Sequence, residues 1–112
     1  MAYGDIVIID KTNPLSVTTT NITYHEDVIG VVKTGGANEE MVTIQYAGMI
    51  EVNVGTYAVN IGDNIYTGDL YGLAYGTAYG WPGTIAKAIT SKPTGATGMV
   101  KVLLSGGLPE VY

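Results

Sequence analysis

The chain of 112 residues contains no cysteine, no arginine and no phenylalanine. The absence of cysteine excludes disulfide bonds and thiolate chemistry. Without arginine, five scattered lysines are the only strongly basic side chains in a protein whose net charge is −5. Proteins bind nucleic acids through a positive patch that replaces counterions, so this composition disfavours nucleic-acid binding.

Long apolar runs are missing as well. No stretch approaches the length of a membrane span, which needs about 18 apolar residues. The first ten residues, MAYGDIVIID, lack the basic start and the apolar core of a signal peptide. The sequence therefore predicts a protein that is neither embedded in a membrane nor secreted through a signal peptide. If it acts outside a cell, we expect it to leave by a route such as lysis.

Residues that could support catalysis are scarce. The single histidine, His25, lies beside Glu26 and Asp27, but an H-E-x-x-H zinc motif needs a second histidine. None of the three serines lies in a G-x-S-x-G motif, and no phosphate-binding G-x-x-x-x-G-K-[ST] loop occurs. We therefore predict no enzyme activity, no catalytic residue and no cofactor, and we interpret residues 25–27 as a solvated turn.

Alternating and β-branched runs extend along the whole chain and predict an all-β fold. Short runs separated by Gly, Asn, Asp and Pro are typical of a sandwich or a barrel. We expect one domain over residues 1–112, a compact β-barrel or β-clip of about eight short strands with no helix longer than two turns. The expected strands are 6–9, 17–23, 28–32, 41–46, 49–54, 64–67, 84–90 and 99–104.

The apolar members of these runs are expected to form the core. Alternate side chains of a strand point to opposite faces, so one apolar set in each run can face inward. The expected core residues are Ile6, Ile8, Ile29, Val31, Val42, Ile44, Ile50, Val52, Ile65, Ile85, Val100 and Val102.

The order of elements repeats along the chain. Gly4-Asp5 begins the first half and Gly62-Asp63 begins the second, and a Met-Val strand follows at 41–42 and at 99–100. Residues 4–47 and 62–105 are therefore consistent with two similar, interlocked β halves; the alternative is that such patterns recur in all β proteins. Residues 106–112 form a C-terminal tail, either a second arm or a frayed end.

The Gly-Asp pairs have a local explanation. Glycine tolerates positive φ, and aspartate caps a turn through a hydrogen bond to nearby backbone. Calcium binding by Asp5, Asp63 and Asp69 is the alternative, but the D-x-D-x-D-G loop is absent. We predict no metal site.

Residues 71–81, YGLAYGTAYGW, carry tyrosine and glycine at a spacing of four, and glycine keeps this spacing from 68 to 80. A helix is disfavoured because each glycine costs about 1 kcal/mol relative to alanine. In an extended chain, side chains four residues apart lie on the same face. We therefore expect a hairpin arm that presents its tyrosines to one side, followed by an irregular aromatic loop.

Such a charge-poor row of tyrosines is typical of a surface that another protein covers. An arm that folds back onto its own barrel and a carbohydrate-stacking platform are the alternatives. The expected interface residues are Tyr66, Tyr71, Tyr75, Tyr79, Trp81 and Tyr112.

Motifs spread over residues 4–105 resemble small all-β virion proteins of tailed phages, especially the capsid cement (decoration) proteins. Related modules in phage tail fibres and bacterial surface stalks are also similar. The Tyr-Gly stretch departs from the alanine- and serine-rich sequence that the family has at that place. The motifs are GDIVIIDKTNPLSVTTT (4–20), VIGVV (28–32), EMVTIQYAG (40–48), GDNIY (62–66), GTIAKA (83–88) and GMVKVLL (98–104).

The resemblance implies a structural protein without enzyme activity, which self-associates and binds a lattice of major capsid protein. It implies assembly in the cytoplasm of a host cell, a place in the virion, and an extracellular location after release. Two alternatives differ in class: a self-assembling extracellular filament subunit, and a tail-fibre or adhesin module that binds carbohydrate.

Overall fold

The computed structural model describes residues 1–36, 41–80 and 83–105, which form nine β-strands and no helix. The predicted all-β fold is therefore confirmed. Within the same residues there is no helix long and apolar enough to cross a membrane. The strands are β1 (Ile6–Ile9), β2 (Val17–Thr18), β3 (Val28–Thr34), β4 (Thr43–Gln45), β5 (Ala47–Val54), β6 (Asn64–Thr67), β7 (Ala74–Thr77), β8 (Ala86–Ala88) and β9 (Gly98–Ser105).

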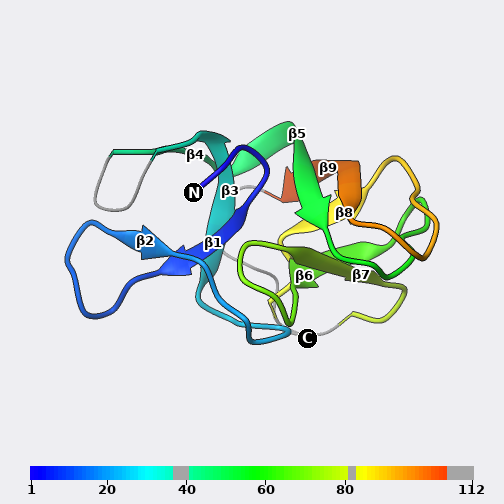
Figure 1. Ribbon diagram of the computed structural model, residues 1–112, viewed down its shortest axis with the longest axis horizontal. Coiled ribbons are helices and arrows are strands. Elements are labelled where there is room, and N and C mark those ends of the chain that lie inside the picture. Colours follow the sequence, from blue (N-terminus) through cyan, green and yellow to red (C-terminus); the bar gives the residue numbers. More distant parts are fainter. Residues whose placement is uncertain (37–40, 81–82, 106–112) are drawn as a thin grey trace.

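The strands form an open sheet and a closed barrel, which lie side by side in Figure 1. The open sheet has the order β2-β1-β3-β4, and the barrel has the order β5-β7-β6-β8-β9. Strand β5 follows β4 after one residue but belongs to the barrel. It pairs with β9 over its full length, from Ala47↔Ser105 to Val54↔Gly98, and a parallel pair, Val54↔Ala74, joins it to β7.

Eight of the nine strands lie at the predicted runs, and the ninth, β7, comes from the Tyr-Gly stretch. The largest difference is the run 17–23, of which only Val17–Thr18 is a strand. After Thr18 the chain leaves the sheet and crosses to the barrel, where the carbonyl of Thr67 accepts the N–H of Tyr24 (3.2 Å). These backbone groups therefore bond to β6 and not to a ladder within the open sheet.

Nine of the twelve predicted core residues are buried. The other three, Ile29, Val42 and Ile44, are only half-buried, so their assignment to a closed core was wrong for the described residues. All three belong to the open sheet or precede its last strand. Within the part of the chain that the structure describes, β4 pairs with β3 alone.

The two halves of the chain share one strand order. The open sheet is β2-β1-β3-β4, and the barrel without β5 is β7-β6-β8-β9; every neighbouring pair in both sets is antiparallel. The two sets therefore have the same strand order. The two sets differ because β5 closes only the second of them into a barrel.

Asp10 begins the loop between β1 and β2 with a capped turn. Its Oδ1 accepts hydrogen bonds from the N–H and the hydroxyl of Thr12 (2.9 and 2.7 Å), and its Oδ2 accepts one from Asn13 Nδ2 (3.0 Å). Hydrogen bonds from Asn13 and then Thr12 lower the pKa of Asp10 from 3.8 to about 2. Hydrogen bonds to a carboxylate favour its charged form.

We expect Asp10 to titrate at about 2 in an NMR pH series of the folded protein. A folded pKa below the unfolded value stabilises the protein above that unfolded value, and the stabilisation is lost as pH falls through the folded pKa. The variant Asn13→Ala should move the titration of Asp10 back toward 3.8. An unchanged titration in that variant would show that the Asn13 hydrogen bond is not the cause.

Candidate subunit interface

The Tyr-Gly stretch forms one half of a β-hairpin that is built into the barrel. Strand β7 pairs antiparallel with β6, with Tyr66 opposite Tyr75. The N–H of Gly68 donates to the carbonyl of Leu73 (2.9 Å) at the base of the connecting loop. The predicted hairpin is present, but its second strand lies against the barrel and is not a free arm.

The predicted interface residues differ in their exposure, and two of them are not described by the structure. Tyr66 is fully buried, so its prediction as an interface residue was wrong: it faces the interior, and its hydroxyl donates to the carbonyl of Tyr79 (2.7 Å). Trp81 and Tyr112 lie outside the described residues.

The expected single row of tyrosines is broken. Tyr71 and Tyr79 are 68% and 72% exposed, whereas Tyr75 is half-buried. Only residues 74–77 are extended, because Gly72 turns the chain with φ +78° and the chain bends again after Thr77. The even spacing therefore does not bring the three rings onto one face.

Three glycines of the repeat have three different structural reasons. A Cβ on Gly68 would lie 2.9 Å from the carbonyl oxygen of Leu73, and one on Gly76 would lie 3.0 Å from a methyl group of Val59. Gly72 has a positive φ, which side chains other than glycine rarely adopt. Glycine therefore recurs here for three unrelated reasons: a close approach to the neighbouring strand at Gly68, a left-handed turn at Gly72 and a packing contact at Gly76.

The change Gly76→Ala is expected to destabilise the barrel by about 1–3 kcal/mol, because added methyl groups in a packed core force neighbours to shift. Val59 and Ile65, the nearest neighbours, are themselves fully buried. Gly55→Ala is the matched control, since a Cβ there would meet only Leu73 Cδ1 at 3.8 Å. Chemical denaturation would measure both, and equal midpoints would contradict the packing explanation.

Four tyrosines form a cluster that links the open-sheet half to the barrel. The ring of Tyr24 meets those of Tyr66 and Tyr75 edge-to-face at centroid distances of 4.8 and 6.0 Å, and Tyr57 meets Tyr75 at 5.4 Å. Burial, and then the neighbouring Tyr75 and Tyr66, raise the pKa of the Tyr24 hydroxyl above its usual value of 10. Edge-to-face ring pairs stabilise a fold in addition to the effect of the apolar area that the rings bury.

Tyr24 and Tyr57 were not among the interface residues predicted from the sequence. Neither lies in a repeat, and the barrel brings them to the hairpin from distant loops. The only feature of the sequence that pointed to them was their residue type, and the chain has nine tyrosines.

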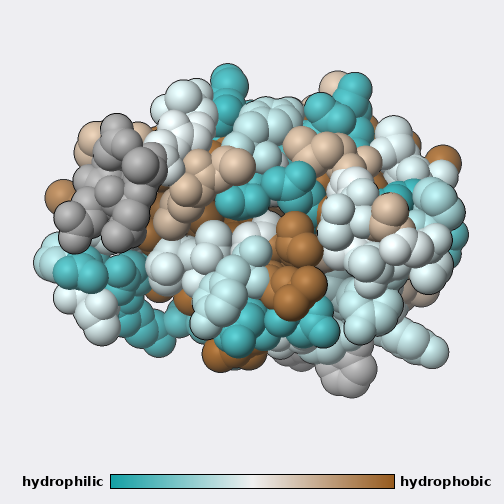
Figure 2. All heavy atoms as spheres, in the orientation of Figure 1, coloured by the Kyte–Doolittle hydropathy of each residue, from teal (hydrophilic) through white to brown (hydrophobic). Residues whose placement is uncertain are grey.

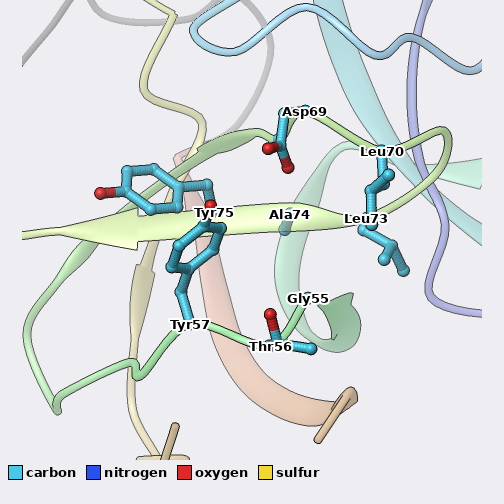
Figure 3. Close-up of a pocket in the computed structure, with 9 residues that line it drawn as sticks. Gly55, Thr56, Tyr57, Asp69, Leu70, Leu73, Ala74 and Tyr75 are labelled. Carbon is cyan, nitrogen blue, oxygen red and sulfur yellow. The ribbon is translucent and has the colours of Figure 1, made fainter. Parts of the chain in front are cut away.

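A shallow pocket of about 130 Å³ lies between the loop 55–57 and the hairpin. Figure 3 shows the rings of Tyr57 and Tyr75 on one side and Leu70 and Leu73 on the other, with the carboxylate of Asp69 between them at the rim. Pockets for drug-sized ligands are usually about 300–1,000 Å³. The arrangement thus fits one inserted side chain or one sugar ring better than a large ligand.

Apolar and aromatic side chains are exposed at this end of the hairpin. We define the hairpin patch as Tyr57, Leu70 and Tyr71, which are 51%, 54% and 68% exposed. On the side of the molecule shown in Figure 2, strongly apolar residues form small separate areas among pale and hydrophilic ones. The hairpin patch therefore combines large contact surfaces with polar tips, as tyrosine does at many interfaces.

The only histidine takes part in a turn at the predicted place, but the turn is less solvated than predicted: His25 and Asp27 are half-buried, and Glu26 is exposed. The N–H of Asp27 donates to His25 Nδ1 (3.0 Å), and the Asp27 carboxylate pairs with Lys11 (3.0 Å). Among the described residues, no three His, Asp or Glu side chains gather in a way that could hold a metal ion. Comparison with protein-family models, curated proteins and solved structures gives no match.

Proposed function

We propose that this protein is a non-enzymatic structural protein of a virion, a decoration protein that binds major capsid protein and bridges its subunits. In this proposal it assembles in the cytoplasm of the host cell and is extracellular after release of the virion. The observation that carries the proposal is the hairpin patch, which exposes Tyr57, Leu70 and Tyr71 on a closed barrel. An aromatic and apolar surface of this kind is typical of protein contacts.

The composition supports the same proposal. Only 13% of the residues are charged, and the net charge of −5 keeps the free subunit soluble. Tyrosine provides a large contact area at a low cost in side-chain entropy. Modest contacts of this kind, repeated by bridging over a lattice, add up to strong binding through effective concentration.

The double variant Leu70→Ser/Tyr71→Ser is expected to weaken capsid binding about 30-fold or more, because the loss of even one anchor at the centre of an interface costs about 2 kcal/mol or more. Both side chains are more than half exposed, so the fold should be unaffected. Binding to empty capsids of the phage that encodes the protein would be measured by mass photometry.

The matched control is Leu15→Ser/Ile22→Ser, which removes two exposed apolar side chains from the loops of the open-sheet half. It is expected to bind as the unchanged protein does. If both double variants bind equally well, the hairpin patch is not the contact. Polymers of the purified protein in the absence of capsids would favour the filament alternative.

The pocket beside the hairpin patch supports one rival function, a carbohydrate-binding adhesin module. Aromatic rings with a few polar groups are the usual lining of a ligand site, and here Tyr57 and Tyr75 line the pocket together with Asp69 and Thr56. A glycan array separates the two functions. Binding to one sugar class that is lost in Tyr57→Ala would support the rival and contradict the decoration function.

A further inference from the structure

The pocket beside the hairpin patch has a distinctive charge. Among the described residues that line it, Asp69 is the only charged one, and none is basic. The other side chains in the lining belong to a threonine, two tyrosines, two leucines and an alanine. The electrostatic potential in the pocket is therefore set mainly by one carboxylate and by aromatic rings.

Asp69 differs from the other four aspartates of the chain, because it has no structural partner among the described residues. Asp5, Asp10 and Asp63 each accept a backbone N–H through the carboxylate and hold a turn. Asp27 forms an ion pair with a lysine. Asp69 is exposed in the loop between β6 and β7, so its negative charge is available at the rim of the pocket.

Tyr57 and Tyr75 provide two walls of the pocket that stand at a right angle. Their ring centroids lie 5.4 Å apart, and the angle between the ring planes is 90°. The face of an aromatic ring is negative because of its quadrupole, and it attracts a cation within about 6 Å of the centroid. A small cation in the corner between two perpendicular rings can contact both.

These rings are held in position by the rest of the fold. Tyr75 is half-buried, and its ring meets that of Tyr24 edge-to-face at 6.0 Å. The loop that carries Tyr57 is anchored by Lys92, whose ammonium group donates to the carbonyl of Tyr57 (3.0 Å). A preformed pocket loses less conformational entropy when a ligand binds.

The ammonium group of Lys92 does not occupy the pocket. Its Nζ is bonded to the backbone carbonyls of Tyr57 and Pro93 (3.0 and 2.9 Å), the residue is 8% exposed, and it is not part of the lining. Its positive charge opposes a bound cation, and the unpaired carboxylate of Asp69 compensates for that charge. The ring faces stay available to a ligand from outside.

Apolar side chains provide the remaining walls. Figure 3 shows Leu70 and Leu73 on the side away from the tyrosines, and Leu73 is half-buried. Ala74, which also lines the pocket, is buried. Such walls exclude water, and cation–π contacts are stronger when they are desolvated. Methyl or methylene groups next to a cationic nitrogen would pack on these walls, whereas sugar hydroxyls would lose water there without gaining partners.

We infer that this pocket binds an organic cation, an alkylammonium group that lies against the rings of Tyr57 and Tyr75 and beside the carboxylate of Asp69. The volume of about 130 Å³ suits a group of a few heavy atoms, such as trimethylammonium or the end of a lysine side chain. The same chemistry occurs in free quaternary ammonium compounds and in lysine side chains of a partner protein. The site goes beyond the proposed capsid function and does not depend on it.

Choline and 3,3-dimethylbutan-1-ol are matched probes, because they have the same shape and only choline is charged. Each would be titrated into the purified protein at constant ionic strength and followed by amide NMR. Choline is expected to bind about tenfold more tightly than the neutral alcohol, as a desolvated cation–π contact requires. The shifts should concentrate at Gly55, Gly68 and Ala74, which line the pocket.

Variants of Tyr57 separate the ring face from the hydroxyl group. Tyr57→Phe keeps the ring and is expected to bind choline within about twofold of the unchanged protein, whereas Tyr57→Leu keeps only an apolar wall and should bind it about tenfold more weakly. The neutral alcohol should bind equally well to both. The matched control is Tyr79→Leu, because Tyr79 is 72% exposed and does not line the pocket.

A second pair of variants tests the carboxylate. Asp69→Asn is expected to weaken choline binding about threefold, the size of effect typical of an exposed charge pair. Glu26→Gln removes an exposed carboxylate outside the pocket and should leave binding unchanged. Equal effects of these two variants would show that net charge, and not the position of Asp69, attracts the cation.

N-acetyl-lysine methylamide identifies the source of the cation. Tighter binding of this compound than of choline would assign the pocket to a lysine side chain of a partner protein. Tighter binding of choline would assign it to a free quaternary ammonium compound. Either result supports the cation site.

Three results would overturn the inference. The first is equal binding of choline and the neutral alcohol, or no shift at the pocket with choline at any concentration. The second is choline binding that is as strong in Tyr57→Leu as in Tyr57→Phe. The third is a neutral sugar that binds the pocket more tightly than every cation tested. None of these titrations contains capsid, so a failure here is distinct from a failure of capsid binding.

Discussion

The change Ile65→Ala is expected to destabilise the protein by about 2–5 kcal/mol, the usual cost of truncating a buried isoleucine. Ile65 is fully buried in the main core cluster, between β7 and β8. Its register partners are Gly76 and Ala86, which are too small to move into the space that the lost atoms would leave. The cavity should therefore remain open.

Thermal unfolding followed by circular dichroism would measure this effect as a fall in Tm of about 10–20 °C. The control is Ile61→Ala, four residues earlier in the same segment, because Ile61 is 71% exposed. It should change Tm little, since exposed truncations are usually within about 0.5 kcal/mol of neutral. Comparable losses in both variants would mean that the inward face of β6 is assigned wrongly.

The fold class and most strands were predictable because local patterns determine them. Alternation placed Ile50 and Val52 on the inner face of β5, and both are buried. Alternation does not show which strands close into a barrel. Ile44 alternates as regularly as Ile50, yet it lies in an open sheet and is only half-buried.

The candidate interface was less predictable, because exposure depends on distant parts of the chain. Tyr66 and Tyr71 were both predicted to lie at the interface, but Tyr24 packs on the ring of Tyr66 from a loop more than 40 residues earlier. The prediction from residue spacing assumed that the chain is extended through Gly72, but the backbone turns at this residue. Tyr57 lies beside the hairpin because the barrel folds that way, and the sequence around Tyr57 does not predict this position.

The loop that carries Tyr24 depends on one buried hydroxyl. Thr67 is fully buried, and its Oγ1 donates to the carbonyl of Ile22 (2.8 Å) and accepts the N–H of His25 (2.8 Å). The change Thr67→Val keeps the shape but leaves both backbone groups without this partner. Each buried polar group left unpaired costs about 1–3 kcal/mol. We therefore expect a loss of about 2–4 kcal/mol in the free energy of unfolding.

The same change should alter the titration of Tyr24. Its raised pKa comes first from burial and then from Tyr75 and Tyr66, so a loop that lifts from the barrel should return the pKa toward 10. The sign follows from linkage: a folded pKa above the unfolded one contributes stability that is lost as pH rises beyond about 10. This loss at high pH should be smaller in Thr67→Val.

The matched variant Thr67→Ser keeps the hydroxyl and removes only a methyl group, so it separates hydrogen bonding from packing. We expect it to cost about 1 kcal/mol and to leave the tyrosine titration unchanged. Ultraviolet titration of the tyrosines and urea denaturation would compare the two. If Thr67→Ser is destabilised more than Thr67→Val, the methyl group and not the two hydrogen bonds holds the Tyr24 loop on the barrel.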